Sequence, residues 1–250
     1  MSKSQEELGM DLRSYLDQIV QDPIEKFRRF TTWTDADKKE FEKLLKELKK
    51  PFNKDKETAK EKGDRLENLV EFIIRKTYFF EVLKNIHTET NEIDDVIILS
   101  DRGKQAIQSF NLSRKLIPID QDLFLGECKN YDSNLGVTYV GKFYSLLSVT
   151  GILFGIIFTQ KGLTGNSAGY KDAYGLTKVL RMIEVSKDKD FYILTFTIED
   201  YEKMLDGTTF FDLVKAKKLE MQLASDYTNF ITDNKHEAED QIKAILNDYS

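Results

Sequence analysis

The segment Leu123-Phe124-Leu125-Gly126-Glu127-Cys128-Lys129 runs from apolar residues directly into a carboxylate and an ammonium group two positions apart. Its apolar half predicts a buried β-strand, in which successive side chains point to opposite faces of the sheet. Glu127 and Lys129 are therefore expected on one face of the strand and Cys128 on the other. Because buried charges are costly unless they are paired, this strand end is either solvated or part of a site.

The spacing of an acid and a lysine is common in this chain, and only its surroundings single out Glu127 and Lys129. A second predicted strand, residues 92–99, lies upstream and carries Asp94 and Asp95 near its start. An acid on one strand, with an acid and a lysine on the next, indicates a metal site beside a cationic side chain. The same spacing occurs in three polar, helix-like surroundings that indicate surface charge: Asp37-Lys39, Glu47-Lys49 and Asp233-Lys235.

The composition is that of an ordinary globular chain of 250 residues, 40% hydrophobic and 32% charged. Its single cysteine leaves no disulfide framework and favours a reducing compartment. The polar N-terminus lacks the apolar region of a signal peptide, and the most apolar run, residues 146–158, is interrupted by Gly151 and Gly155. We therefore expect a cytoplasmic protein without a membrane segment.

The formal net charge of −6 argues against a nucleic-acid partner, although the charge is unevenly distributed. Between residues 136 and 182 the cations outnumber the acids, of which Asp172 is the only one. This mildly basic centre is compatible with a surface that faces phosphate groups. Its cations are Lys142, Lys161, Lys171, Lys178 and Arg181.

Apolar residues at helical spacing predict several helices, the clearest of which carries Leu66, Leu69, Val70 and Ile73. Glu67 lies next to this apolar stripe and is the helix's candidate site residue. The order helix, three strands, helix, strand, helix predicts an α/β fold whose mixed sheet opens with an antiparallel hairpin. Further helices are expected at 5–20, 35–49, 137–149, 170–182, from 197, at 210–223 and at 237–246; strands at 79–88, 92–99, 123–129, 152–159 and 191–196; and a polar connection at 100–118.

This order of elements, with an acid followed by Glu-x-Lys, resembles the PD-(D/E)xK nuclease superfamily, and within it the Mrr-type restriction endonucleases. The resemblance implies a restriction-endonuclease-like core of order αβββαβ, with a mixed central sheet flanked by helices, over residues 61–185. It leaves a helical N-terminal extension at 1–60 and a mostly helical C-terminal extension at 186–250. The segments that carry it are Gly63-Asp64-Arg65-Leu66-Glu67, Glu92-Ile93-Asp94, Gly126-Glu127-Cys128-Lys129-Asn130-Tyr131, Gly155-Ile156-Ile157-Phe158-Thr159 and Gly162-Leu163-Thr164.

The chemistry of a nuclease suits these residues. Hydrolysis of a phosphodiester needs a hard cation to neutralise developing charge and a water held in line with the leaving oxygen. Mg²⁺ takes oxygen ligands and keeps several waters, so the carboxylates of Asp94 and Glu127 suffice, and Mn²⁺ is expected to substitute for it. The resemblance implies that the backbone carbonyl of Cys128 is a third ligand and that Lys129 orients the attacking water. It also implies that Glu67 holds a second ion or orients a water.

Each of these residues also has an ordinary structural explanation. Asp94 and Asp95 suit the solvated edge of a hairpin, and Glu127 with Lys129 suits a surface ion pair of little energetic weight. Cys128 is better explained as a small core residue than as a nucleophile, since neither histidine of the chain is recognisably placed to activate it. Taken together in this order, the charged residues favour a site.

We therefore expect a metal-dependent endonuclease that hydrolyses DNA, in restriction or in defence against foreign DNA. A homodimer is expected, because cutting both strands usually requires two active sites. One alternative is a catalytically inactive module that binds nucleic acid or protein on the same fold. Another is an RNA or repair nuclease. Isolated aromatic residues such as Trp33 and Tyr131 are interpreted as packing residues rather than as stacking partners for bases.

Overall fold

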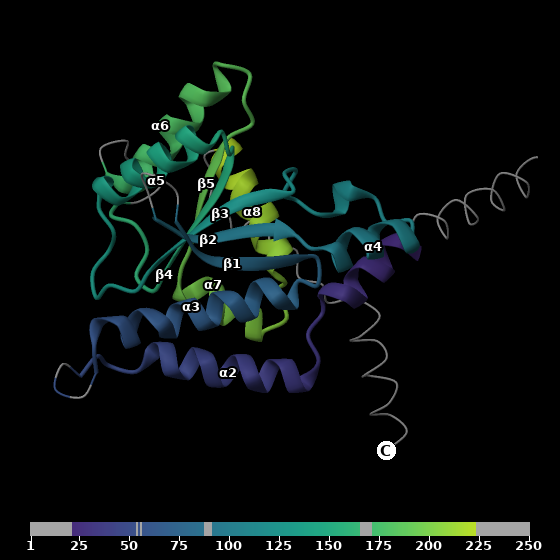
Figure 1. Cartoon of the computed structure of the whole chain (residues 1–250), viewed down its shortest axis with the longest axis horizontal. Coiled ribbons are helices and arrows are strands. Elements are labelled where there is room, and N and C mark those ends of the chain that lie inside the picture. Colours follow the sequence, from purple (N-terminus) through teal and green to yellow (C-terminus); the bar gives the residue numbers. More distant parts are fainter. Residues whose placement is uncertain (1–21, 54, 56, 88–91, 166–171, 224–250) are drawn as a thin grey trace, which may run out of the picture.

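The computed structural model describes residues 22–53, 55, 57–87, 92–165 and 172–223 (Figure 1). The helices predicted at 5–20 and 237–246 lie outside these ranges, as does most of the turn between the first two predicted strands. Among the residues that the structure describes, no helix is both long enough and apolar enough to cross a bilayer.

A five-stranded sheet lies at the centre of the molecule, with its strands side by side in chain order, β1-β2-β3-β4-β5. β1, β2 and β3 pair antiparallel, whereas β3, β4 and β5 pair parallel. The predicted mixed α/β sheet that opens with a hairpin is confirmed, and the predicted bounds of the second and third strands match. The strands are β1 (Phe80–His87), β2 (Glu92–Leu99), β3 (Leu123–Lys129), β4 (Phe154–Thr159) and β5 (Tyr192–Phe196).

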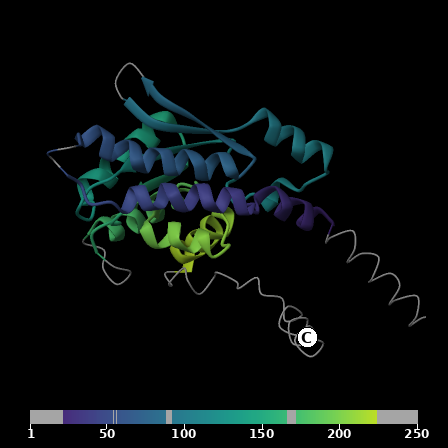
Figure 2. The same cartoon turned by 90° about the horizontal axis from the view of Figure 1, so that it is seen from below.

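One face of the sheet, here called the α3 face, is covered by α3 (Ala59–Lys76), against which α2 (Asp35–Lys49) packs (Figure 2). Thr34 begins α2 with a capping box, as its sequence predicts. The helices α7 (Ile198–Leu205) and α8 (Phe210–Leu223) add their buried side chains to the same core. The sheet contributes alternate residues to it, among them Ile97, Leu99, Phe124, Phe154, Ile156, Phe158, Leu194 and Phe196.

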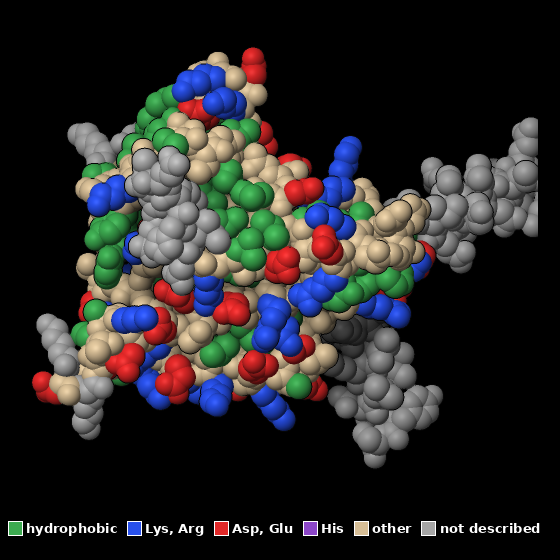
Figure 3. All heavy atoms as spheres, viewed as in Figure 1, with side chains coloured by type: hydrophobic (Ala, Val, Ile, Leu, Met, Phe, Trp, Pro, Cys, Tyr) green, Lys and Arg blue, Asp and Glu red, His purple; other side chains and the backbone are tan. Residues whose placement is uncertain are grey.

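The opposite face, here called the α5 face, is covered by α5 (Val137–Thr150) and α6 (Ala173–Val185). All six residues of β4 are buried, which confirms the prediction of a strand enclosed on both faces. Over β1 and the start of β3, however, Leu83 and Leu123 stay exposed, and hydrophobic side chains gather at the centre of the view in Figure 3. The second core contains Val96, Leu125, Leu135, Val140, Phe143, Leu147, Ile157, Leu163, Ala173, Leu180, Phe191 and Ile193.

The polar connection predicted at residues 100–118 is wrong, because this segment contains α4 (Asp101–Ser109) and the 3₁₀ helix η1 (Arg114–Leu116). Ser100 begins α4: its Oγ accepts a hydrogen bond from the backbone N of Gly103 at 3.1 Å. The same hydroxyl donates to the carbonyl of Phe79 at 2.9 Å, which ties α4 to the start of β1. With Gly103 and Ala106 as the buried residues of α4, the helix lacks the apolar stripe that identifies helices in sequence.

The sheet and its cores continue beyond residue 185, where the sequence predicts the start of a C-terminal extension. β5 pairs with β4 as the fifth strand, and α8 packs against β5. A buried ion pair joins Asp200 of α7 to Lys217 of α8 with an N–O distance of 3.0 Å. The described part of that extension is therefore packed against the rest of the sheet.

Two helical glycines should respond oppositely to replacement by alanine. A Cβ at position 103 would overlap the backbone carbonyl of Phe79 and lie 2.9 Å from its Cα, so Gly103→Ala should lower the free energy of unfolding by about 1–3 kcal/mol. A Cβ at Gly141, within α5, meets no atom within 4 Å, so Gly141→Ala should stabilise by about 1 kcal/mol through helix propensity. Urea denaturation of both variants measures these changes; destabilisation of equal size in both would contradict the packing explanation.

Candidate active site

The antiparallel register of β2 and β3 brings the predicted site residues together. Asp95 pairs with Gly126, and the same register sets Asp94 beside Glu127 on the adjoining strand. Because side chains alternate, Asp94, Glu127 and Lys129 all point to the α5 face, on which Val96 and Leu125 are buried. Three charged residues from two strands thus share one end of the sheet.

The ammonium group of Lys129 lies between the two carboxylates. Its Nζ is 2.8 Å from Oδ2 of Asp94 and 2.8 Å from Oε1 of Glu127. The side chains of Lys129, Asp94 and Glu127 are only 22%, 29% and 21% exposed, so these ion pairs are partly shielded from water. We call this group the lysine–carboxylate triad; it is the arrangement expected of a site rather than of a solvated surface pair.

The triad shifts the proton affinities of its members. Burial and the nearby Asp94 carboxylate raise the pKa of Glu127 above its ordinary value, although Lys129 opposes the shift. Burial on its own would lower the pKa of Lys129, but Glu127 and Asp94 outweigh it and raise that pKa. Lys129 therefore stays protonated at neutral pH and serves as a cation and hydrogen-bond donor, rather than as a base.

A second charged group lies on the α3 face of the same strands. The Sγ of Cys128 donates to Oδ2 of Asp95 at 3.2 Å, and Lys84 of β1 pairs with Glu71 of α3 at 2.8 Å. Asp95 is 2% exposed. Because side chains alternate along β2, Asp95 points to the face opposite that of Asp94. Burial and the Asp95 carboxylate raise the pKa of the Cys128 thiol well above its ordinary value, which supports its interpretation as a packing residue rather than a nucleophile.

Glu67, the fourth predicted site residue, is half-buried on α3. Its charge acts on Asp95, Cys128 and Lys84, the group on the α3 face. Within the described part of the chain, no hydrogen bond or ion pair joins Glu67 to the lysine–carboxylate triad. The structure thus brings together three of the four predicted residues, and the role predicted for Glu67 stays a prediction.

The residues present fit a single hard divalent cation. Asp94 and Glu127 hold like charges close enough for Asp94 to raise the pKa of Glu127, and a cation between them would relieve that repulsion. Two carboxylates with the backbone carbonyl of Cys128 offer the oxygen donors that Mg²⁺ or Mn²⁺ prefers. Among the described residues, no cluster of three or more His, Cys, Asp and Glu side chains is arranged to hold a metal. A donor set of two carboxylates and one carbonyl would leave the remaining positions around an ion to water, as Mg²⁺ allows.

The contacts around the triad were not predicted from the sequence, and Tyr131, interpreted there as a packing residue, is exposed. The buried Asn130, next to Lys129, donates to the backbone carbonyl of Lys62 in α3 at 2.6 Å and so ties the strand end to that helix. The ring of Tyr131, 42% exposed, lies 5.5 Å from the ring of Tyr139 at the start of α5. The charges of Lys129 and Glu127 act on Tyr131, so this aromatic pair borders the triad. Sequence patterns carry no signal for such pairs, because the partners lie far apart in the chain.

The mildly basic centre predicted from the sequence is partly occupied by internal contacts. Lys178 is buried with its Nζ 4.7 Å from the centre of the Tyr174 ring. Arg181 stacks its guanidinium 3.9 Å from the Tyr192 ring centre and donates to the carbonyl of Phe191. Over α2 and α3, Lys and Arg side chains alternate with Asp and Glu (Figure 3). Two of the five central cations are thus engaged within the fold.

No family model, curated protein or solved structure matches the chain. The chemistry of the site is therefore inferred from its own side chains and their geometry.

The buried Asp95 should give the protein a measurable pH dependence. Burial raises the pKa of Asp95 to about 6 from an ordinary value of 3.8, so as pH rises the unfolded chain loses its proton before the folded one does. The wild type should lose about 3 kcal/mol of stability, relative to Asp95→Asn, between pH 3.5 and 7.5. Guanidinium denaturation of both proteins at each pH measures the difference, and a difference that does not change with pH would contradict the shift.

Proposed function

We propose that this protein is a metal-dependent nuclease that hydrolyses DNA phosphodiester bonds, with a core of the restriction-endonuclease-like PD-(D/E)xK class. The observation that carries the proposal is the lysine–carboxylate triad, with Lys129 Nζ 2.8 Å from both Asp94 and Glu127. The antiparallel hairpin that leads into the Glu-x-Lys strand supports the same class. Action in restriction or defence, as a homodimer, is part of the proposal.

Each member of the triad has a distinct role in the proposed reaction. Asp94 and Glu127, with the backbone carbonyl of Cys128, would hold one Mg²⁺ or Mn²⁺ ion. When bound, this ion supplies positive charge that neutralises the developing charge of the scissile phosphate. Lys129 is protonated, so it donates hydrogen bonds that orient the attacking water and stabilise negative charge on the phosphate oxygens.

The surroundings of the triad support a nucleic-acid substrate over a small phosphate ester. Tyr131 is exposed beside Tyr139 at the border of the triad. Bases stack on exposed aromatic rings, so this pair offers a contact for a nucleotide next to the scissile phosphate. The partly exposed end of β3 also leaves an approach for an extended chain.

Removing the ammonium of Lys129 should abolish cleavage while leaving the fold intact. We expect the wild type to cut plasmid DNA in Mg²⁺ or Mn²⁺, and Lys129→Gln to cut roughly 10²–10³-fold more slowly, because it lacks a donor to the transition state. The matched control is Lys84→Gln on the α3 face, which should cut at the wild-type rate. Methylated and unmethylated plasmids, and a single-stranded RNA, are compared in the same assay.

The outcomes of this assay separate the candidate functions. Equal cleavage by Lys129→Gln and the wild type would contradict the nuclease proposal. Binding of DNA without cleavage by any of the proteins would favour the inactive binding module. Cleavage of RNA alone would favour the ribonuclease alternative. Sedimentation velocity of the wild type tests the homodimer.

Ion binding should be measurable without any substrate. At ten times its dissociation constant, Mg²⁺ should add about 1.4 kcal/mol and raise the melting temperature of the wild type by a few degrees. Asp94→Asn should remove this shift, because it loses one of the two carboxylates. Lys129→Gln should bind the ion at least as tightly as the wild type, since the ammonium competes for the same carboxylate oxygens. A shift that persists in Asp94→Asn, measured by differential scanning calorimetry, would place the ion elsewhere.

A further inference from the structure

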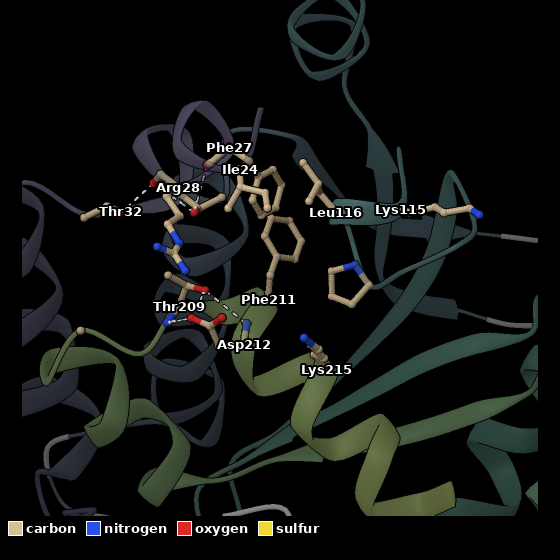
Figure 4. Close-up of a pocket in the computed structure, with 13 residues that line it drawn as sticks. Ile24, Phe27, Arg28, Thr32, Lys115, Leu116, Thr209, Phe211, Asp212 and Lys215 are labelled. Carbon is tan, nitrogen blue, oxygen red and sulfur yellow. Dashed lines mark hydrogen bonds between the residues drawn. The ribbon is translucent and has the colours of Figure 1, made fainter. Parts of the chain in front are cut away.

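A cavity of about 590 Å³ lies away from the lysine–carboxylate triad (Figure 4). It opens between the helical segment at residues 22–31, the chain around η1, and the start of α8. Leu116 and Pro118, which line it, precede β3, whereas Glu127 and Lys129 lie among the last three residues of that strand. No member of the triad lines the cavity. Its size is that of a pocket for one small molecule.

Part of the cavity wall is apolar and includes two aromatic rings. The rings of Phe27 and Phe211 lie 5.6 Å apart, and Phe211 is almost fully buried at the start of α8. Ile24, Leu116 and Pro118 complete the apolar lining. In Figure 4, Phe27 and Ile24 come from the helical segment, and the ring of Phe27 lies next to that of Phe211. Such a surface suits a flat, apolar ring system.

Cationic side chains without partners stand around this apolar lining. Arg28, Lys115 and Lys215 all line the cavity and are exposed. Among the contacts of the described residues, none of these three side chains makes a hydrogen bond or an ion pair. Figure 4 shows the groups of Arg28 and Lys215 directed toward the cavity, and that of Lys115 directed away. Two cations are therefore available to an anion in the cavity.

The carboxylate of Asp212 in the lining is already engaged. Its Oδ2 accepts hydrogen bonds from the backbone N of Thr209 at 3.0 Å and from the Thr209 hydroxyl at 2.6 Å, as the cap of α8. The cavity thus has more positive than negative groups, next to the positive end of a helix of 14 residues. An anionic ligand is favoured there over a cationic one.

We propose that this cavity binds a nucleoside phosphate. The base would lie against the apolar wall formed by Phe27, Phe211 and Leu116. The phosphate group would be held by Arg28, whose planar guanidinium matches phosphate oxygens in two-point contacts, and by Lys215. A cavity of this size with two inward cations suits a small molecule rather than the continuous backbone of a nucleic acid. This inference stands on the cavity alone and does not depend on the proposed nuclease activity.

Isothermal titration calorimetry on the full chain tests the proposal, with ATP, GTP, CTP and UTP, their monophosphates, adenosine and inorganic phosphate as probes. At least one nucleoside phosphate should bind at least tenfold more tightly than adenosine or inorganic phosphate. The double variant Arg28→Gln/Lys215→Gln should weaken that binding at least tenfold. The matched control, Lys43→Gln on α2, removes an exposed lysine outside the cavity and should bind as the wild type does.

Several results would overturn the proposal. They are equal binding by the double variant and the wild type, equal affinity for inorganic phosphate and nucleotides, and binding only of a DNA duplex. A thermal melt of the double variant should match the wild type, because both side chains are exposed; if it does not, the single variants replace it. Lys129→Gln should bind the nucleotide normally, so a failure of the nuclease proposal is distinguishable from a failure of this one.

Discussion

The alternation of side chains along β2 and β3 is the constraint on which the rest of the structure depends. At the shared end of these strands, charged residues point to both faces of a sheet that helices cover on both sides. Each face balances its own charges: Lys129 lies between Asp94 and Glu127 on one, and Cys128 donates to Asp95 on the other. A slip of β3 by one residue would turn Glu127 and Lys129 to the apolar α3 face and separate them from Asp94. The charges therefore help to specify the pairing of the strands that carry them.

The protonated state of Lys129 decides what the triad is able to do. Two carboxylates within 2.8 Å hold the ammonium in its charged form, so it offers hydrogen bonds and positive charge. The same carboxylates repel each other, and burial together with this repulsion raises the pKa of Glu127. Either a divalent ion or the ammonium offsets the repulsion between the two carboxylates. The proposed metal and Lys129 therefore compete in part for the same carboxylate oxygens. On the other face, Asp95 is almost fully buried, and the thiol of Cys128 is only a weak hydrogen-bond donor to it. This arrangement lowers the stability of the fold and does not indicate a reactive group.

Local patterns predicted the fold and the core of the site, whereas contacts between distant segments escaped them. A period of two residues placed Glu127 and Lys129 on one face and Cys128 on the other, and the bounds of β2, β3 and α2 followed from apolar patterns. α4 was missed because its buried residues include a glycine and an alanine rather than an apolar stripe. The contacts of Asn130 with Lys62, and of Tyr131 with Tyr139, arise only when α3 and α5 dock on the sheet. The surroundings of Glu67 were equally unpredictable from the sequence. Its position beside an apolar helical stripe does not reveal which charged group on the sheet it will influence.

The strand order, which follows the order of the chain, has a consequence for how the protein is made. Each strand pairs with the strand that precedes it in the chain, so the sheet is able to grow by addition at one edge. All members of the triad belong to β2 and β3, and both strands are complete when residue 129 has been added. The cover of the α5 face comes later in the chain, from α5 and α6. All three charged residues of the triad are therefore present in the growing chain before the helices that cover their face of the sheet have been made.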